Sequence, residues 1–373
     1  MNVMIACGGT GGHLFPGIAV AETLLARGHT VQLLVSEKAV DQTSLRMLRM
    51  GDRVGPRLSV RPVSAIGYTG VRQVARFGAR LAKATRDCAT LCAEFVPDAV
   101  LGMGGFTSAP AVLAASWRRV PSLIHESNAV PGRANRWMGR LADHIAVGMA
   151  HCAKFFGHKP VTVTGTPIRA ALRRGKVDDA VERLGLARDR QTVLVMGGSQ
   201  GAHAINEAMA CALPWLDGWT ERLQFIHLSG EADETFLRDA YEKNGFRAKV
   251  MSFCGEMELA YSAADLVVSR AGAGTLTEIA AFGLPAILIP YPHAAGNHQV
   301  HNARGFELAG AARLIEQTQF GQMHATKGER LAECIANILD DDNRRQHMAA
   351  AARSLAVLDA EERIADLIEQ HAD

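Results

Sequence analysis

The fold is decided by residues 3–13, which read Val3-Met4-Ile5-Ala6-Cys7-Gly8-Gly9-Thr10-Gly11-Gly12-His13. The apolar half predicts a short buried strand, and the glycines predict a tight turn, because glycine adopts backbone conformations that other residues avoid. Pro16 predicts the start of a helix that runs to about Arg27 and stops at Gly28. A strand that passes through a glycine turn into a helix is typical of anion-binding sites. The spacing differs from the dinucleotide fingerprint G-x-G-x-x-G, so no nicotinamide or flavin cofactor is predicted.

Residues 193–203 repeat this pattern in the second half of the chain, as Val193-Leu194-Val195-Met196-Gly197-Gly198-Ser199-Gln200-Gly201-Ala202-His203. Both stretches have an apolar strand, a pair of glycines, a hydroxyl residue, another glycine and a histidine. One copy in each half predicts an α/β protein with two similar domains, each a doubly wound parallel sheet. Strand patterns alternate with helix patterns elsewhere, as parallel sheets require. Further strands are predicted at 30–36, 99–106 (with its closing glycines), 121–125, 225–228, 248–253, 265–269 and 286–290, and helices from about 108, at 178–186 and from about 331.

The length of 373 residues suits two domains that each bury a core. We place the first domain at residues 1–166 and the second at 167–355, with the crossing in the stretch 161–169. A helix at about 356–373 is expected to pack back on the first domain. Because ligands bind at the carboxyl ends of parallel strands, the glycine turns of both domains are expected to face a shared cleft.

The composition excludes several classes of protein. Hydrophobic residues make up 48% and charged residues 21% of the chain, which is ordinary for a soluble α/β protein. A net charge of +2 gives no argument for nucleic acid as a partner. The seven cysteines are scattered and lack zinc-site spacing, so we interpret them as reduced thiols of a cytosolic protein. No apolar run of about 18 residues occurs, so no membrane span is predicted.

Two side chains in the glycine turns suggest chemistry. His13 can exchange a proton near neutral pH, which makes it a candidate general base. The alternative is a tight turn that carries an incidental histidine. Ser199 adds a hydroxyl donor to the amides of the second turn, and amides with a hydroxyl suit a diphosphate. The alternative for Ser199 is a plain turn.

Four other polar residues near strand ends each have two interpretations. Glu278 either completes a helix capping box with Thr275 or accepts hydrogen bonds from ribose hydroxyls. Arg169 could have a functional role, by contacting a phosphate or by stabilising the crossing between the domains. The alternative is that it forms only a surface ion pair. The amides Asn128 and Gln299 suit sugar hydroxyls or an acetamido group, but such residues are also common turn formers.

Three histidines, at positions 293, 298 and 301, lack an HExxH arrangement and a nearby acidic partner, so no metal site is predicted. Residues 340–342 are three aspartates at a helix junction, where helix capping explains them better than a metal does. Residues 71–86 place basic side chains at helical spacing beside apolar ones. Such a helix can lie on an anionic membrane surface, and Trp117 could add an interfacial anchor. The alternative is a solvated helix face.

Five motifs occur in the order and spacing of one family, and together they cover almost the whole chain. They are Gly8–His13, Gly102-Met103-Gly104-Gly105-Phe106, His125-Glu126-Ser127-Asn128, Gly197–Ala202 and Arg270–Glu278. The chain thereby resembles the MurG family, the bacterial glycosyltransferases of family 28. The resemblance implies a GT-B fold with two Rossmann-like domains. It also implies inverting transfer of N-acetylglucosamine from UDP-N-acetylglucosamine to the muramoyl 4-hydroxyl of lipid I, which is undecaprenyl-diphospho-N-acetylmuramoyl-pentapeptide.

The products implied are UDP and lipid II, made for peptidoglycan without a metal or cofactor. The implied location is the cytoplasmic face of the inner membrane, as a peripheral protein with other cell-wall synthesis proteins as candidate partners. The resemblance makes His13 the catalytic base. It places the following residues in the donor site: Thr10, Gly11, Gly12, Asn128, Arg169, Ser199, Cys254 (through its backbone, near uracil), Ala273, Gly274, Thr275, Leu276, Thr277, Glu278 and Gln299.

Three positions depart from the family pattern. Phe106 stands where a tyrosine is usual, and Ser127 where a glutamine is usual, which affects expected acceptor contacts. Gly296 stands where related sequences often have aspartate, so the choice between Gln299 and His298 stays open. The alternative functions are a UDP-N-acetylglucosamine 2-epimerase or another lipid glycosyltransferase of the same fold, and then a non-enzymatic nucleotide-sugar sensor. Such epimerases rely on several acidic residues, whereas only Glu126 and Glu278 lie near the glycine turns.

Overall fold

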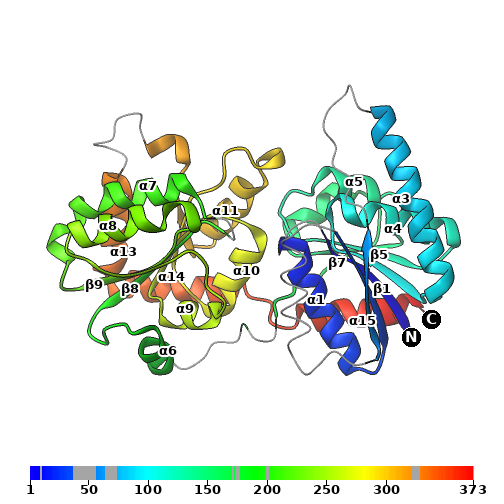
Figure 1. The fold of residues 1–373 in the computed structure, drawn as a ribbon, viewed down its shortest axis with the longest axis horizontal. Helices are drawn as coiled ribbons and strands as arrows, with labels where there is room; N and C mark the ends of the chain where they lie inside the picture. The colour runs from blue at the N-terminus through cyan, green and yellow to red at the C-terminus, as the bar shows by residue number, and fades with distance from the viewer. Residues whose placement is uncertain are drawn as a thin grey trace. The chain divides into compact units, whose positions relative to one another are not determined.

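A computed structural model describes residues 1–8, 11–36, 56–63, 74–169, 172, 177–198, 201–320 and 328–372 of the chain. The chain forms two compact units (Figure 1). Unit 1 consists of Met1–Arg169 and Val357–Asp373, and unit 2 consists of Ala170–Ala356. Each unit is built around one parallel sheet, which confirms the predicted α/β class.

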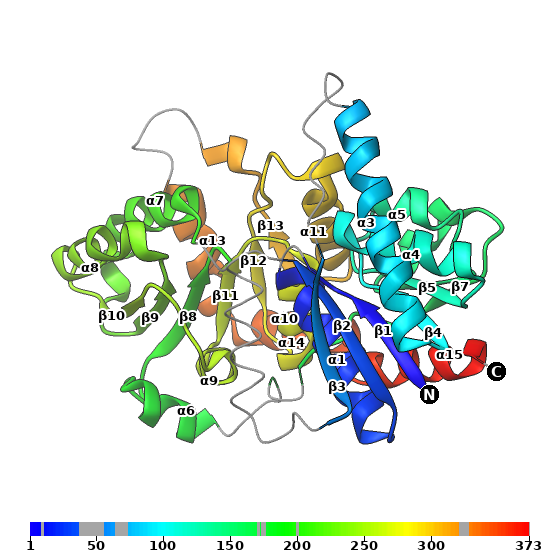
Figure 2. The ribbon, with the colours of Figure 1, turned by 45° about the vertical axis from the view of Figure 1, so that its right-hand side comes forward.

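The sheet of unit 1 has the strand order β3-β2-β1-β4-β5-β6-β7 in the described part of the chain, and every neighbouring pair is parallel. Figure 2 shows β1 between β2 and β4, and in the register Val3 pairs with both Val31 and Ala99. The strands are β1 (Asn2–Ala6), β2 (Thr30–Ser36), β3 (Leu58–Val63), β4 (Ala99–Gly102), β5 (Ser122–Glu126), β6 (His144–Val147) and β7 (Val161–Val163).

Helices cover both faces of this sheet, because alternate residues of a strand point to opposite faces. Val3 and Ile5 of β1 pack in one core cluster with α1 and α15, whereas Met4 and Ala6 pack in another with α3 and α4. The helices are α1 (Gly11–Ala26), α3 (Val74–Phe95), α4 (Gly105–Arg118), α5 (Arg133–Met138), the 3-10 segment η2 (Ala150–Phe156) and α15 (Ala360–Ala372).

The sheet of unit 2 is also parallel, with the order β10-β9-β8-β11-β12-β13 among the described residues. Val193 and Val195 of its central strand β8 pack in the core cluster that contains α7, α8 and α13. On the other face, the hydroxyl of Tyr261 in α9 reaches Sδ of Met196. The strands are β8 (Gln191–Met196), β9 (Leu223–Leu228), β10 (Arg247–Met251), β11 (Leu266–Ser269), β12 (Ala286–Leu288) and β13 (Ala312–Leu314). The helices are α6 (Val177–Leu184), α7 (His203–Ala212), α8 (Glu234–Lys243), α9 (Met257–Ala263), α10 (Ala273–Phe282), α11 (His298–Leu308), α13 (Glu329–Leu339) and α14 (Asp342–Ser354), with 3-10 segments η3 (Leu213–Trp219), η4 (Glu231–Asp233), η5 (Ala295–Asn297) and η6 (Gln317–Phe320).

Two helices begin earlier than the sequence predicts. Helix α1 starts at Gly11, so Pro16 lies inside it and does not open it. A proline at this place removes only one main-chain bond, to the carbonyl of Gly12, and the helix tolerates that loss. Helix α4 starts at Gly105 instead of near Ser108. Both corrections place glycines in the first helical turn, where their amides are free to bind a ligand.

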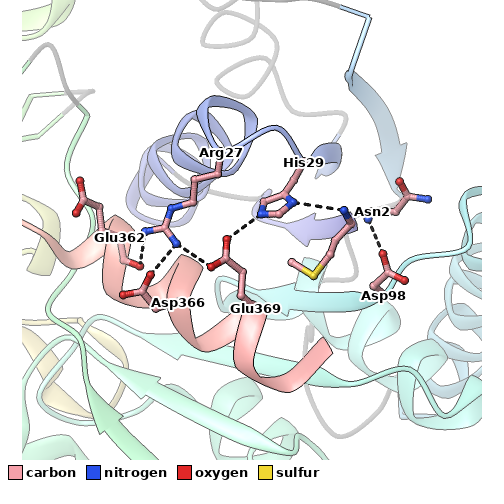
Figure 3. Close-up of polar contacts among 8 residues, drawn as sticks. Asn2, Arg27, His29, Asp98, Glu362, Asp366 and Glu369 are labelled. Carbon is pink, nitrogen blue, oxygen red and sulfur yellow. Dashed lines mark hydrogen bonds and ion pairs between the residues drawn. The ribbon is translucent and has the colours of Figure 1, made fainter. Parts of the chain in front are cut away.

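The C-terminal helix α15 is part of unit 1 (Figure 3). Arg27 at the end of α1 bonds to Asp366 at 2.6 Å and to Glu369 at 3.1 Å. These groups are partly exposed, so the pairs contribute less than about 1 kcal/mol each. The fully buried Ile364 and Ile368 of α15 contribute more, about 1.5 to 3 kcal/mol each, through the core they share with α1.

Candidate active site

Close packing of glycines sets the position of the first turn. A Cβ atom on Gly8 would lie 2.2 Å from the backbone nitrogen of Ser36, and one on Gly17 would lie 2.4 Å from Cβ of Cys7. Only glycine therefore allows α1 to approach the end of β1 this closely. The approach brings Gly11, the exposed Gly12 and the half-buried His13 to the carboxyl end of the sheet. Thr10 lies outside the described residues.

The ring of His13 lies against a second glycine turn. A Cβ atom on Gly104 would lie 3.1 Å from Nε2 of His13, and one on Gly105 would lie 3.1 Å from Cε1. Both glycines have positive φ, 104° and 73°, which disfavours any larger residue. Ser108 fixes this turn, because its hydroxyl accepts from the amide of Gly104 at 3.2 Å and donates to the carbonyl of Ala6 at 2.8 Å. The imidazole thus rests on a rigid backbone surface.

A buried carboxylate organises the loop after β5. Glu126 is 4% exposed, and each of its two carboxylate oxygens accepts two hydrogen bonds. Oε1 accepts from the backbone and side-chain amides of Asn128 at 3.0 and 2.9 Å. Oε2 accepts from the amide of Gly132 at 3.0 Å and from Nδ2 of Asn135 at 2.8 Å. Asn128 is therefore held in place by Glu126, with its remaining surface half-exposed.

Arg169 lies beside the first turn of α1. Its guanidinium carbon is 4.6 Å from the centre of the Phe15 ring, which is a cation–π contact. A Cβ atom on Gly11 would lie 3.3 Å from the same ring. Within the described part of the chain no carboxylate pairs with Arg169, so the surface ion pair is not what holds it. Unit 1 therefore gathers Gly11, Gly12, His13 and Arg169 around one helical turn.

The glycine turn that follows β8 in unit 2 is also constrained by close packing and by positive φ. Gly198 and Gly201 have φ of 106° and 75°, and a Cβ atom on Gly201 would lie 2.2 Å from the carbonyl oxygen of Ser229. The amide of Gly201 donates to the carbonyl of Gly198 at 3.0 Å and closes the turn before α7. Ser199 lies outside the described residues.

A buried polar chain that the sequence did not predict supports this turn from behind. The fully buried amide of Asn206 donates to the carbonyl of Ser229 at 2.9 Å and to Asp233 at 2.7 Å. Nε2 of His227 lies 3.0 Å from Oδ1 of Asn206, and Nδ1 lies 2.9 Å from the hydroxyl of Tyr241. The carbonyl that Gly201 packs against is therefore fixed by a network drawn from α7, β9 and α8.

Burial lowers the pKa of His227 from 6.5 to about 3. Between these pH values the unfolded chain binds a proton that the folded chain does not, so stability falls as the pH decreases below 6.5. We expect the free energy of unfolding of unit 2 to lose up to about 1.4 kcal/mol per pH unit from this group. Urea denaturation between about pH 7 and pH 4 measures the slope. The variant His227→Gln should show a shallower slope, and an identical slope in both proteins would contradict the assignment.

The stretch Arg270–Glu278 forms the start of α10, whose N-cap is Gly272. Thr275 is therefore inside the helix, and the capping-box interpretation of Thr275 and Glu278 is wrong. Oε2 of Glu278 instead accepts from the buried hydroxyl of Tyr261 at 2.7 Å, and burial holds the pKa of that hydroxyl well above its usual value. Gly274, Thr275, Thr277 and Glu278 are half-buried, whereas the side chains of Ala273 and Leu276 are buried, so only their backbone can face a ligand.

Gln299 joins the start of α11 to two strand ends. Its Oε1 accepts from the amide of Tyr291 at 2.9 Å and from that of Ala271 at 3.3 Å. His298 instead bonds through Nδ1 to the carbonyl of Ala295, in its own turn, at 2.8 Å. Gln299 thus contacts the segment just before α10, which favours it over His298 as the candidate donor-site residue. Arg270, whose guanidinium bonds to the carbonyls of Ile289 and Pro290, braces the same region.

Two predictions remain, one for Cys254 and one for the aspartates at 340–342. Cys254 follows β10 and is 9% exposed, and burial raises the pKa of its thiol, so its backbone is the part available to a ligand. The aspartates at 340–342 do cap a helix, because the carboxylate of Asp341, the N-cap of α14, accepts from the amide of Arg344 at 2.9 Å. The candidate residues thus form one group in unit 1 and another in unit 2.

Two family models match the sequence. The model described as the glycosyltransferase family 28 N-terminal domain matches residues 3–147, and the C-terminal domain model of the same family matches residues 192–370. The UDP-N-acetylglucosamine--N-acetylmuramyl-(pentapeptide) pyrophosphoryl-undecaprenol N-acetylglucosamine transferase of Geotalea uraniireducens (strain Rf4) is 38% identical over 370 residues, covering 98% of this chain and 97% of that protein. The protein of the same name from Syntrophus aciditrophicus (strain SB) is 39% identical over 368 residues, with the same coverage.

Two solved structures align with almost the whole chain. The crystal structure of Acinetobacter baumannii MurG aligns with a TM-score of 0.76 and 28% identity, over 99% of both chains. A putative UDP-N-acetylglucosamine 2-epimerase from Listeria monocytogenes aligns with a TM-score of 0.70 over 99% of this chain and 96% of that one. Its identity is only 16%, so that likeness concerns the fold alone.

Proposed function

Because this chain belongs to glycosyltransferase family 28, among the N-acetylmuramyl-(pentapeptide) pyrophosphoryl-undecaprenol N-acetylglucosamine transferases, we propose that it converts lipid I to lipid II. It is a glycosyltransferase with a GT-B fold. The observation that carries the proposal is identity of 38 to 39% with these transferases along 98% of the chain. In the proposed reaction the muramoyl 4-hydroxyl attacks the anomeric carbon of UDP-N-acetylglucosamine, and UDP leaves.

His13 is proposed as the general base. It must take the proton of the attacking hydroxyl as the new C–O bond forms, and the bond from the anomeric carbon to the UDP oxygen breaks with inversion. Its imidazole is half-buried and held against the Gly104–Gly105 turn, so its position is fixed while one side remains open to solvent. A fixed base close to its substrate saves the entropy of bringing the two together.

The leaving diphosphate is proposed to bind to backbone amides and helix ends. The first turns of α7 and α10 supply amides that have no acceptor within their own helix, and helix N-termini favour negative charge. Arg169 and the first turn of α1 supply a cation and amides in unit 1. Donors that are already in place stabilise the charge as it develops.

Incubation with radiolabelled UDP-N-acetylglucosamine and lipid I tests the function. Label in the lipid fraction, together with released UDP, supports the transfer. Label that stays on a water-soluble nucleotide sugar with changed stereochemistry at carbon 2 would indicate the epimerase instead. Binding without turnover would indicate a sensor.

Glu278 is proposed to accept hydrogen bonds from the ribose of UDP. We expect Glu278→Ala to weaken UDP binding by about 10- to 100-fold, since hydrogen bonds to a charged group contribute about 1.5 to 3 kcal/mol. Isothermal titration with UDP measures the change. The matched control is Tyr261→Phe, which keeps the carboxylate and removes only its hydroxyl partner, so its effect should be smaller. Unchanged affinity in Glu278→Ala would remove the ribose role.

The basic face of α3 is proposed to bind an anionic membrane surface. Arg76, Arg80, Lys83 and Arg86 are exposed on it, and Trp117 of α4 is 70% exposed. Residues 71–73 of the predicted basic stretch lie outside the described residues. Within the part of the chain that the structure describes, none of the helices has both the length and the apolar composition needed to cross a bilayer.

We expect Arg76→Glu with Arg80→Glu to weaken binding to vesicles that contain anionic lipid by about 30-fold or more, because each basic residue near such a surface contributes about 1 kcal/mol. Co-sedimentation with the vesicles measures this. The matched control reverses two exposed arginines of unit 2, Arg313 and Arg330. Equal losses in both double variants would mean that α3 has no special role.

A further inference from the structure

The chain passes between the two units twice, after Arg169 and after Ala356. The segments beside these two points touch each other inside unit 1. A Cβ atom on Gly165 would lie 2.5 Å from Cβ of Val357, and Gly165 has a φ of 78°. A residue other than glycine at position 165 would therefore push the two segments apart.

A buried histidine holds this point of contact. His125 of β5 is fully buried, and its Nε2 lies 2.9 Å from the carbonyl oxygen of Gly165. Because a carbonyl only accepts, Nε2 carries the hydrogen and donates it. Burial lowers the pKa of His125, so the ring is neutral and Nδ1 is left as an acceptor, 3.4 Å from the hydroxyl of Ser127. The hydroxyl of Thr164 donates to the same carbonyl at 3.0 Å.

The same histidine is joined to the candidate site. Its backbone carbonyl accepts from Nδ2 of Asn135 at 3.0 Å, and that amide also donates to Glu126. A Cβ atom on Gly104 would lie 3.1 Å from Nδ2 of Asn135 and 3.1 Å from Nε2 of His13. His125, Asn135 and the glycine turn under His13 therefore form one continuous set of contacts.

We propose that His125 is a positioning residue that fixes the two connections to unit 2 relative to His13. The inference rests on the proposed function, in which unit 2 holds the sugar donor and His13 activates the acceptor. A displacement of about 1 Å between reacting groups can lower a rate by about 10²-fold. Fixing both connections at the carboxyl end of β5 limits such displacement at the point where the chain leaves unit 1.

The test compares His125→Leu, which cannot donate, with His125→Gln, which can. His125→Leu is expected to lower kcat by about 10-fold or more, with the Kd for UDP unchanged, and His125→Gln is expected to recover most of kcat. A loss of kcat without a loss of donor affinity separates positioning from general damage to the fold. Equal kcat in His125→Leu and wild type, or no recovery in His125→Gln, would overturn the inference.

Two further proteins keep the test decisive if His125→Leu folds poorly. Val357→Ala loosens the packing on Gly165 without touching the site, and it should lower kcat several-fold at constant UDP affinity. His144→Gln changes another buried histidine of unit 1, which bonds to Thr162, and it should leave kcat unchanged. The opposite pattern, with kcat lost in His144→Gln and kept in Val357→Ala, would overturn the inference.

Amide hydrogen exchange without substrate gives a readout that does not depend on the proposed reaction. Backbone amides at residues 164–166, 168–169 and 357–359 should exchange about 10-fold faster or more in His125→Leu than in wild type. His144→Gln should not show this change. Unchanged exchange at both segments in His125→Leu would overturn the inference even if the enzyme is active. Faster exchange at both would support it even if the transfer assay failed.

Discussion

Replacing His13 by alanine is expected to lower kcat by about 10²- to 10⁴-fold, the usual contribution of a general base. The Kd for UDP-N-acetylglucosamine should stay within about two-fold, since the proposed role of the imidazole is in proton transfer and not in holding the nucleotide. Single-turnover transfer to lipid I and isothermal titration of the donor measure the two quantities. Because the ring lies on the Gly104–Gly105 turn, alanine leaves an open space there.

The internal repeat supplies the matched control. His203 occupies the corresponding place after the Gly197–Gly201 turn, at the first residue of α7, and its side chain is 69% exposed. It pairs with Asp233 at 3.0 Å, and this hydrogen bond raises the pKa of the imidazole. His203→Ala should change kcat by less than about 10-fold, well short of the effect of losing a general base. If His13→Ala lowered kcat and donor affinity to the same extent, His13 would be a binding residue and not the base.

Glu126→Ala is expected to have the largest effect on stability, a loss of about 3 to 5 kcal/mol in the free energy of unfolding of unit 1. The carboxylate accepts four hydrogen bonds in a buried place, so its removal takes one acceptor from each of the donor groups of Asn128, Gly132 and Asn135. Urea denaturation followed by tryptophan fluorescence measures the change. A background with Trp215 and Trp219 replaced by phenylalanine leaves Trp117 and Trp137, both in unit 1, as probes.

Two control variants are compared with Glu126→Ala. Glu94→Ala removes an exposed carboxylate from α3 and should change stability by less than about 0.5 kcal/mol. Glu126→Gln keeps one acceptor oxygen but places an amide donor against other donors. Its loss of unfolding free energy should therefore be larger than that of Glu94→Ala and smaller than that of Glu126→Ala. A stable Glu126→Ala protein would show that the loop after β5 rearranges at little cost.

Much of the fold could be predicted because the main strands have local signals. The sequence predicts a strand at residues 30–36, and β2 has those limits. Four strands were missed, and each has a physical reason. β7 is a sheet edge of only three residues, at the start of the stretch 161–169 that is interpreted as the crossing between the domains. β3 and β13 are sheet edges, with Arg61 and Arg313 exposed, so neither shows a continuous apolar run. β6 lies inside the sheet, between β5 and β7, but has only four residues, and one of them is a histidine.

The candidate site was less predictable, because its supports come from distant parts of the chain. The sequence identified the glycine turns, but it gave no reason to join Asn206 of α7 to His227 of β9 and Tyr241 of α8. Nor did it show that Tyr261 of α9 would bond to Glu278, so a local capping box was an equal interpretation. Patterns within one helix are visible in a sequence, whereas contacts between elements depend on the sheet order that brings them together.

The packing of α15 on α1 has a consequence for how the protein is made. Unit 1 is discontinuous, so a ribosome completes all of unit 2 before it produces the helix that covers the apolar side of α1. During that interval the nascent first unit exposes the surface that later contacts Ile364 and Ile368, and such a surface is open to aggregation or to chaperone binding. A truncated chain of residues 1–169 should therefore be poorly soluble, and adding a peptide of residues 357–372 in trans should improve its recovery.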